Sequence, residues 1–236
     1  MLREARSRGL PLRVIGGGHS FSPLVATDGL LLTLDGYQGL VRADPATGLV
    51  TLRGGTRLWS VAELLAPHGL ALETMGDIDR QSIAGAIQTG THGTGARFTG
   101  FAGTVRALRI ALPDGSVLDT SSTRDRDLFE AARLGLGTIG VILEVTLQCV
   151  PAYRLELAET NPAPRRGGRR VPRDLRERGP PRDLLVPPHR WGKMHWPGAR
   201  ELSWLCPRFE DFRAVRRTAD PEGQLMTPAL RHLLGT

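Results

Sequence analysis

The sequence predicts an α+β fold in which short strands and short helices surround two glycine-rich loops. The first supporting observation is an apolar run over residues 12–15 that leads into Gly16-Gly17-Gly18-His19-Ser20, here called the glycine turn. The second is a loop rich in glycine and threonine over residues 85–95, the second glycine loop. The third is the alternation of apolar and polar side chains over residues 141–149, which is typical of a half-buried strand.

Further short strands are predicted from apolar and β-branched runs. Together with residues 12–15, the predicted strands cover residues 30–34, 49–53, 105–112, 117–120 and 140–150. Pro113-Asp114-Gly115 is a tight-turn sequence, so the runs on either side of it are expected to form a hairpin.

Helices are predicted where apolar side chains recur at helical spacing or where a capping residue precedes them. They cover residues 2–8, 57–66, 82–88, 125–133, 209–215 and 228–234. Thr56 is expected to cap the second of these helices, and Gly9 to end the first. Because the chain enters the first helix midway, we expect it to begin inside a domain.

The net charge of +7 is concentrated in residues 162–190, which hold nine arginines and seven prolines. This composition indicates a linker, or a scar left by a frame shift or deletion, since out-of-frame GC-rich DNA spells arginine, proline and glycine. Aromatic residues are not interleaved with the arginines, so a nucleic-acid partner is not expected. A basic interaction module is the alternative, and steep salt dependence of nucleic-acid binding would reveal it.

The cysteines and the apolar runs indicate the cellular compartment. Cys149 and Cys206 lack the spacing of a disulfide framework or a zinc site, so we expect no metal and a reduced, cytoplasmic location. No apolar run approaches the roughly 18 residues of a membrane span, and residues 1–6 do not resemble a signal peptide. Peripheral membrane association is not expected, although the sequence does not exclude it.

A third glycine-rich segment, residues 135–140, matches the pattern G-x-G-x-x-G. It follows a predicted helix and precedes a predicted strand, which is the reverse of the order in a dinucleotide-binding Rossmann unit. We therefore do not predict a Rossmann fold. Neither a phosphate-binding P-loop motif nor a G-x-S-x-G nucleophile motif is found in the sequence.

The two glycine loops indicate a ligand larger than one phosphate. Glycines without Cβ atoms let the backbone lie against a flat or anionic group, and the histidine then projects toward it. With Thr27-Asp28-Gly29, Gly76-Asp77-Ile78 and residues 82–95, the glycine turn resembles the FAD-binding domain of vanillyl-alcohol-oxidase-type flavoproteins. Within that group it is similar to the sugar-lactone and alditol oxidases, such as gulonolactone and D-arabinono-1,4-lactone oxidases. The resemblance covers residues 2–150 and, again, 191–236.

The resemblance implies a PCMH-type FAD-binding domain of two α+β subdomains over residues 1–153, with its N-terminus truncated. Residues 154–190 would be the linker or scar, and residues 191–236 the remnant of a C-terminal substrate domain. The implied reaction is hydride transfer from a hydroxyl-bearing carbon of a sugar lactone or alditol to flavin N5, with oxygen or another acceptor reoxidising the flavin. The alternative is a truncated relic that binds FAD without turnover.

The resemblance also implies roles for individual residues. His19 would carry FAD covalently through the flavin 8α-methyl group, and the backbone of residues 140–142 would contact the adenine side. The full set of implied FAD-binding residues is Gly16, Gly17, Gly18, His19, Ser20, Gly76, Asp77, Ser82, Gly85, Ala86, Thr89, Gly90, Thr91, His92, Gly93, Gly140 and Ile142.

Three further residues are candidates for the chemistry. Lys193 follows Trp191-Gly192 as the active-site lysine of the family does, and it is the only lysine of the sequence. It would stabilise negative charge on the reduced flavin; otherwise it is a surface lysine. His195 could handle a proton, or it could be structural. Thr94 would face the reacting end of the substrate.

Overall fold

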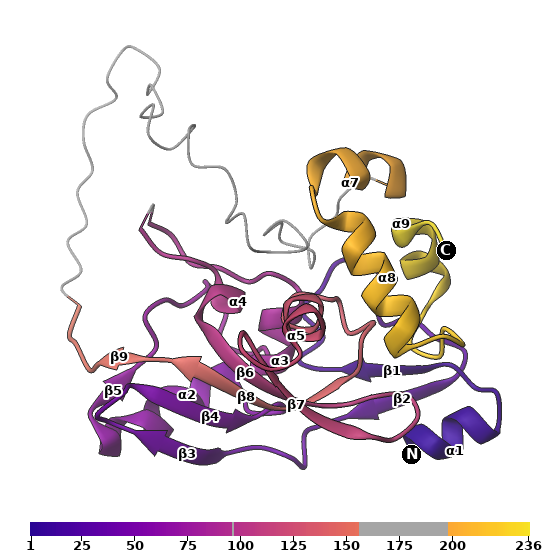
Figure 1. Ribbon diagram of the computed structural model, residues 1–236. Coiled ribbons are helices and arrows are strands. Elements are labelled where there is room, and N and C mark those ends of the chain that lie inside the picture. The colour runs from indigo at the N-terminus through magenta and orange to yellow at the C-terminus, as the bar shows by residue number, and fades with distance from the viewer. Residues whose placement is uncertain (96, 156–197) are drawn as a thin grey trace.

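The computed structural model describes residues 1–95, 97–155 and 198–236. At its centre lies a five-stranded antiparallel sheet with the strand order β3-β4-β8-β6-β7 (Figure 1). Its strands are β3 (Leu40–Asp44), β4 (Leu49–Arg53), β6 (Val105–Ala111), β7 (Val117–Ser121) and β8 (Val141–Gln148). Strands β6 and β7 form the predicted hairpin, and they pair Ala111 with Val117 next to the turn.

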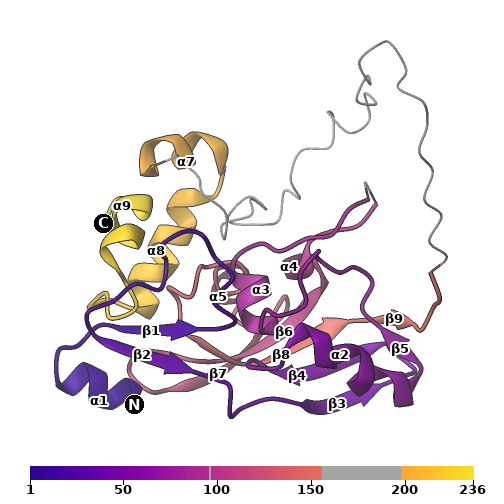
Figure 2. The same ribbon diagram turned by 180° about the vertical axis from the view of Figure 1, so that it is seen from behind.

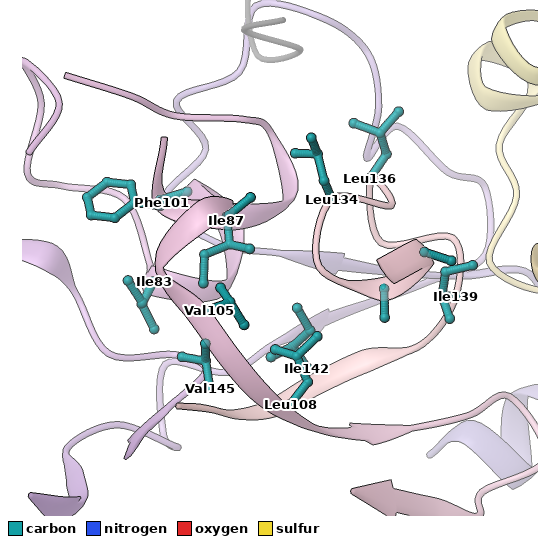
Figure 3. Close-up of a cluster of buried hydrophobic side chains, with 14 of the residues drawn as sticks. Ile83, Ile87, Phe101, Val105, Leu108, Leu134, Leu136, Ile139, Ile142 and Val145 are labelled. Atoms are coloured by element: carbon teal, nitrogen blue, oxygen red, sulfur yellow. The ribbon is translucent and has the colours of Figure 1, made fainter. Parts of the chain in front are cut away.

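Short helices cover one face of this sheet and close its core. These helices are α3 (Ile83–Gln88), α4 (Phe101–Thr104) and α5 (Arg126–Ala132). Figure 3 shows Ile83 and Ile87 of α3 directed toward Val105 and Val145 of the sheet, with Phe101 beside α3. These side chains all belong to one buried hydrophobic cluster, in which α2 (Leu58–Leu65) also takes part through Leu58, Val61 and Leu65.

A second layer is built from both ends of the chain. After α1 (Leu2–Ser7), strand β1 (Leu12–Ile15) pairs in parallel with β2 (Leu30–Thr33). The C-terminal helices α7 (Ala199–Leu205), α8 (Phe209–Ala219) and α9 (Pro228–Leu234) lie at the same end of the molecule, as the two opposite views show (Figures 1 and 2). Leu225 joins Ala5 and Leu12 in a small buried cluster, so this part of the core contains residues from both ends of the described chain.

The structure differs from the predicted elements in a few places. Thr56 does not cap α2, because its hydroxyl donates to the Arg53 carbonyl at 2.7 Å and accepts from the Gly39 N–H at 2.9 Å; Arg57 is the N-cap residue instead. The strand predicted over residues 140–150 is interrupted after Gln148. The two residues of β9 (Val150–Pro151) pair with β5 (Leu70–Ala71) in a separate sheet, and the 3₁₀ helix η1 (Ala66–His68) precedes β5.

Strand β3 and helix α7 were not predicted, and α8 extends beyond residue 215 to Ala219. The linker or scar assigned to residues 154–190 lies almost entirely outside the described residues. Within the part of the chain that the structure describes, none of the helices is long and apolar enough to cross a membrane.

Candidate cofactor site

A cavity of about 260 Å³ lies where three segments of the chain meet. These segments are β1 with the glycine turn, residues 81–89 around α3, and residues 136–142 leading into β8. Ten of the predicted FAD-binding residues line the cavity: Gly16, Gly17, Gly18, His19, Ser20, Ser82, Gly85, Thr89, Gly140 and Ile142. The structure therefore brings together segments that are more than a hundred residues apart in the sequence.

The glycine turn lies directly on the segment that precedes α3. A Cβ atom on Gly16 would stand 2.4 Å from Ser82 Oγ, and one on Gly17 would stand 2.5 Å from the Arg80 carbonyl oxygen. Neither position has room for a side chain. Among the described residues, no protein group accepts a hydrogen bond from the backbone N–H groups of residues 17–20. Consecutive unpaired N–H donors of this kind form a concave site for an anionic group.

The first turn of α3 offers a different arrangement. The N-cap Ser82 accepts a hydrogen bond from the Gly85 N–H at 3.2 Å. The N–H groups of Ile83 and Ala84 donate to the carbonyls of Thr56 and Gly54, at 2.8 and 3.1 Å. These α3 donors are already paired within the protein, whereas the N–H groups of residues 17–20 are unpaired among the described residues.

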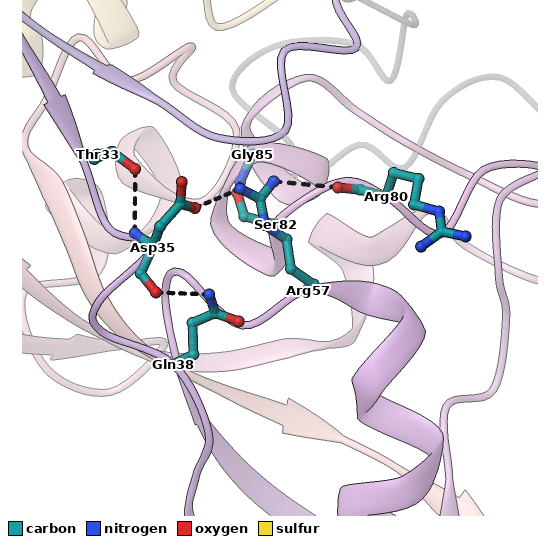
Figure 4. Close-up of polar contacts among 7 residues, drawn as sticks. All are labelled: Thr33, Asp35, Gln38, Arg57, Arg80, Ser82 and Gly85. Carbon is teal, nitrogen blue, oxygen red and sulfur yellow. Dashed lines mark hydrogen bonds and ion pairs between the residues drawn. The ribbon is translucent and has the colours of Figure 1, made fainter.

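A polar network that was not predicted lies against the glycine turn at Gly17 (Figure 4). The Arg57 guanidinium forms an ion pair with Asp35, a residue that lines the cavity, and donates to the Arg80 carbonyl at 3.2 Å. Asp35 is itself fixed, because its N–H donates to Thr33 Oγ1 at 3.1 Å and its carbonyl accepts from Gln38 Nε2 at 2.7 Å. Arg57 thus joins the end of β2 to the segment on which Gly17 lies.

Arg13 and Gln88 also line the cavity, and neither was predicted as a site residue. Arg13 is only 3% exposed, and burial lowers the pKa of its guanidinium to about 10. Two of its nitrogens donate to backbone carbonyls, whereas the buried Nε has no partner among the described residues. An arginine in the apolar run of residues 12–15 was the available signal, because a buried charge needs partners.

Most of the remaining predicted FAD-binding residues form a group beside the cavity and do not line it. Gly76, Asp77, Gly90, Thr91, His92 and Gly93 belong to this group. A Cβ on Gly93 would stand 2.3 Å from the Met75 carbonyl oxygen, and Thr91 Oγ1 lies 2.9 Å from Gln81 Nε2. His92 Nδ1 lies 2.8 Å from the Gly93 carbonyl oxygen. The second glycine loop is therefore packed on residues 74–76 and on Gln81.

The other predicted site residues are placed differently. Ala86 is fully buried in the hydrophobic core, and Thr94 is exposed and does not line the cavity. Lys193 and His195 lie outside the described residues. No group of three or more histidine, cysteine or acidic side chains is arranged for a metal ion in the described ranges.

The cavity fits a flat, anionic cofactor by two features of its own residues. Within the described part of the chain, the glycine turn presents unpaired N–H groups where a side chain would collide, and the buried Nε of Arg13 has no acceptor. Comparison with known proteins is consistent with this fit. The sequence model of the FAD binding domain matches residues 1–121, which is half of the chain. The chain belongs to this FAD-binding-domain family. A second model, that of D-arabinono-1,4-lactone oxidase, matches residues 186–233.

Curated relatives of this FAD-binding domain are named as enzymes that act on sugar lactones. L-gulono-1,4-lactone dehydrogenase of Mycobacterium tuberculosis is 43% identical over 155 residues, which are 66% of this chain and 36% of the relative. L-gulonolactone oxidase of Mus musculus is 39% identical over 155 residues, which are 66% of this chain and 35% of the relative. The chain thus spans about a third of the length of these relatives.

A solved structure agrees on the fold. The 6-hydroxy-D-nicotine oxidase of Arthrobacter nicotinovorans superimposes with a TM-score of 0.57 at 25% identity, covering 64% of this chain and 33% of the oxidase. The predicted α+β fold class and the prediction of FAD as the cofactor are both confirmed.

Proposed function

We propose that this chain is the FAD-binding part of an oxidoreductase that oxidises a hydroxyl-bearing carbon of a sugar lactone or alditol by hydride transfer to flavin N5. The observation that carries the proposal is the glycine turn, whose N–H donors are unpaired among the described residues and line the cavity. The lactone oxidase model over residues 186–233 and the names of the relatives support a lactone as substrate.

In this proposal the N–H groups of residues 17–20 hold the FAD pyrophosphate, and residues 140–142 contact the adenine side. His19 is exposed and lines the cavity, so its imidazole is free to bond to the flavin 8α-carbon. Forming that C–N bond releases a proton from the methyl group to solvent and leaves two electrons on the flavin, which the electron acceptor then removes. Bound FAD supplies the hydride acceptor for the substrate.

The proposal extends to residues beyond the cavity. Residues 1–153 would form the FAD-binding domain, and residues 191–236 would belong to the substrate domain. Lys193 would be the cation that stabilises negative charge on the reduced flavin, with His195 and Thr94 near the substrate. A cytoplasmic location completes the proposal, and the two cysteines, both free and buried, are compatible with it.

The first experiment measures the intact mass and visible absorbance of the purified protein before and after acid precipitation, beside a His19→Ala variant. We expect a yellow pellet with the added mass of one FAD, and loss of both in the variant. The yellow protein is then mixed anaerobically with L-gulono-1,4-lactone, D-arabinono-1,4-lactone and alditols. Bleaching of the flavin absorbance by one of them supports the proposed reaction, and adding oxygen or an artificial acceptor identifies what restores the colour. A yellow protein that none of these compounds bleaches contradicts the proposed reaction.

A further inference from the structure

The loop of residues 135–137, in which Leu136 and Gly137 line the cavity, has a backbone conformation that leucine does not favour at position 136. Leu136 has a φ of +56° and Gly137 a φ of +69°. The left-handed region is costly for leucine, because its Cβ comes too close to the carbonyl oxygen. The Leu136 side chain nevertheless belongs to the buried core, where it lies beside Leu134 (Figure 3). Groups outside this loop are therefore needed to hold it in place.

Gln88, the last residue of α3, forms hydrogen bonds with N–H groups of this loop. Gln88 Oε1 accepts hydrogen bonds from the Gly135 N–H at 3.1 Å and from the Gly137 N–H at 2.7 Å. Its Nε2 donates to the Ala132 carbonyl, at the end of α5, at 2.5 Å. One amide side chain thus satisfies three backbone groups around the strained Leu136.

Arg13, from β1, holds the carbonyl groups of the same loop. Its Nη2 donates to the Leu136 carbonyl at 2.7 Å, and its Nη1 donates to the Gly137 carbonyl at 2.9 Å. Arg13, Gln88, Leu136 and Gly137 all line the cavity. A third hydrogen bond of Arg13, from Nη1 to the Leu225 carbonyl at 2.6 Å, extends this contact to the C-terminal segment.

We propose that Arg13 and Gln88 are positioning residues for FAD, because together they fix residues 135–137 as a preformed wall of the cofactor cavity. The inference rests on FAD binding in this cavity, as the proposed function has it. When the wall is already ordered, FAD binding does not have to supply the free energy of ordering it, and the affinity is higher. Losing either side chain is therefore expected to weaken FAD binding even where the protein stays folded.

The test is a titration with FAD followed by flavin fluorescence, in a His19→Ala background that keeps binding reversible. Arg13→Met and Gln88→Met are expected to raise the Kd for FAD at least about tenfold. The matched control is Arg216→Met, which removes an arginine that is 5% exposed, donates to the Asp220 carbonyl at 3.3 Å and does not line the cavity. The control is expected to lose thermal stability and to keep its Kd within about twofold.

Folded Arg13→Met and Gln88→Met proteins that bind FAD as tightly as their parent would overturn the inference and leave the proposed function standing. A parent that binds no FAD would overturn both. Amide hydrogen exchange of the unsubstituted protein provides a second test if the variants do not fold. The Gly135 and Gly137 amides are expected to exchange slowly before FAD is added. Fast exchange that slows only with FAD would show that the wall is not preformed.

Discussion

The buried carboxylate of Asp220 accepts a hydrogen bond of 2.9 Å from the backbone N–H of Leu225. Its other oxygen accepts from the Gln224 N–H at 2.8 Å, and the Gln224 carbonyl accepts from the Leu12 N–H at 2.8 Å. Asp220 therefore fixes the turn between α8 and α9, and this turn is hydrogen-bonded to β1.

Asp220→Ala is expected to lower the free energy of unfolding by about 2 kcal/mol, because two buried N–H groups lose their acceptor. Urea denaturation measures this loss. The control is Asp127→Ala, whose side chain is 74% exposed and which is expected to change stability by less than about 0.5 kcal/mol. Equal effects of the two substitutions would contradict the role of Asp220 in this turn.

Gly17→Ala is expected to weaken FAD binding at least about tenfold, because a preorganised site tolerates little displacement. The new Cβ would stand 2.5 Å from the Arg80 carbonyl and 2.9 Å from Arg57 Nη1, so the glycine turn has to move. Gly36→Ala is the matched control, since its Cβ would meet no atom within 4 Å. The FAD titration described above compares the two variants, and tight binding by Gly17→Ala would show that the turn adapts without loss.

The two buried thiols are expected to make the protein less stable at high pH. Burial raises the pKa of both Cys149 and Cys206 to about 11, whereas a thiol in the unfolded chain ionises with a pKa near 9. The raised pKa contributes stability below pH 9, and this contribution is lost as the pH rises toward 11. When the pH is raised from 8 to 10, each thiol is expected to lower the free energy of unfolding by about 1 kcal/mol.

Urea denaturation at pH 8 and pH 10 measures this loss, and a variant with Cys149→Ala and Cys206→Ala serves as the reference. If the doubly substituted protein loses as much stability between the two pH values as the original, the thiols are not the cause. Reaction with a thiol reagent offers an independent check, because both cysteines should react only after unfolding.

Arg57 and Asp35 are expected to show a coupling free energy of about 0.5–1 kcal/mol in a double-mutant cycle with Arg57→Met and Asp35→Asn. Their side chains are 18% and 54% exposed, so solvent screens the ion pair only in part, and added salt should reduce the coupling. The more exposed pair Arg109–Asp119, at 48% and 53%, is the control with a smaller expected coupling. A coupling no larger than that of the control would indicate that Arg57 does not stabilise the end of β2 through Asp35.

Local patterns were sufficient to predict most of the fold. The alternation along β8 and the turn residues of the β6–β7 hairpin determine those strands, and α3 forms within the helix predicted over residues 82–88. Strand β3 was missed because it lies at the edge of the sheet, where Val41 and Arg42 are exposed and leave no buried face to produce a pattern. The cap expected at Thr56 failed because its hydroxyl bonds to the Arg53 carbonyl and to the N–H of Gly39, which is 17 residues away.

The candidate site was predictable only in part, for a similar reason. Glycines reveal a close backbone approach from their residue type alone, and Gly16 and Gly17 lie where a side chain does not fit. The contacts of Arg13 and Gln88 are with backbone groups 123 and 49 residues away, so no local pattern indicates them. Hydrogen bonds to backbone atoms are also independent of the partner's residue type.

The bond between Arg13 and Leu225 has a consequence for synthesis of the protein. The two residues are 212 positions apart, so translation at cellular rates separates their appearance by roughly 10–40 s. During that interval β1 has neither its Gln224 contact nor its Leu225 contact, although the glycine turn that follows β1 has already been synthesised. Strand β1 is therefore completed only after the segment that holds Gln224 and Leu225 has been made.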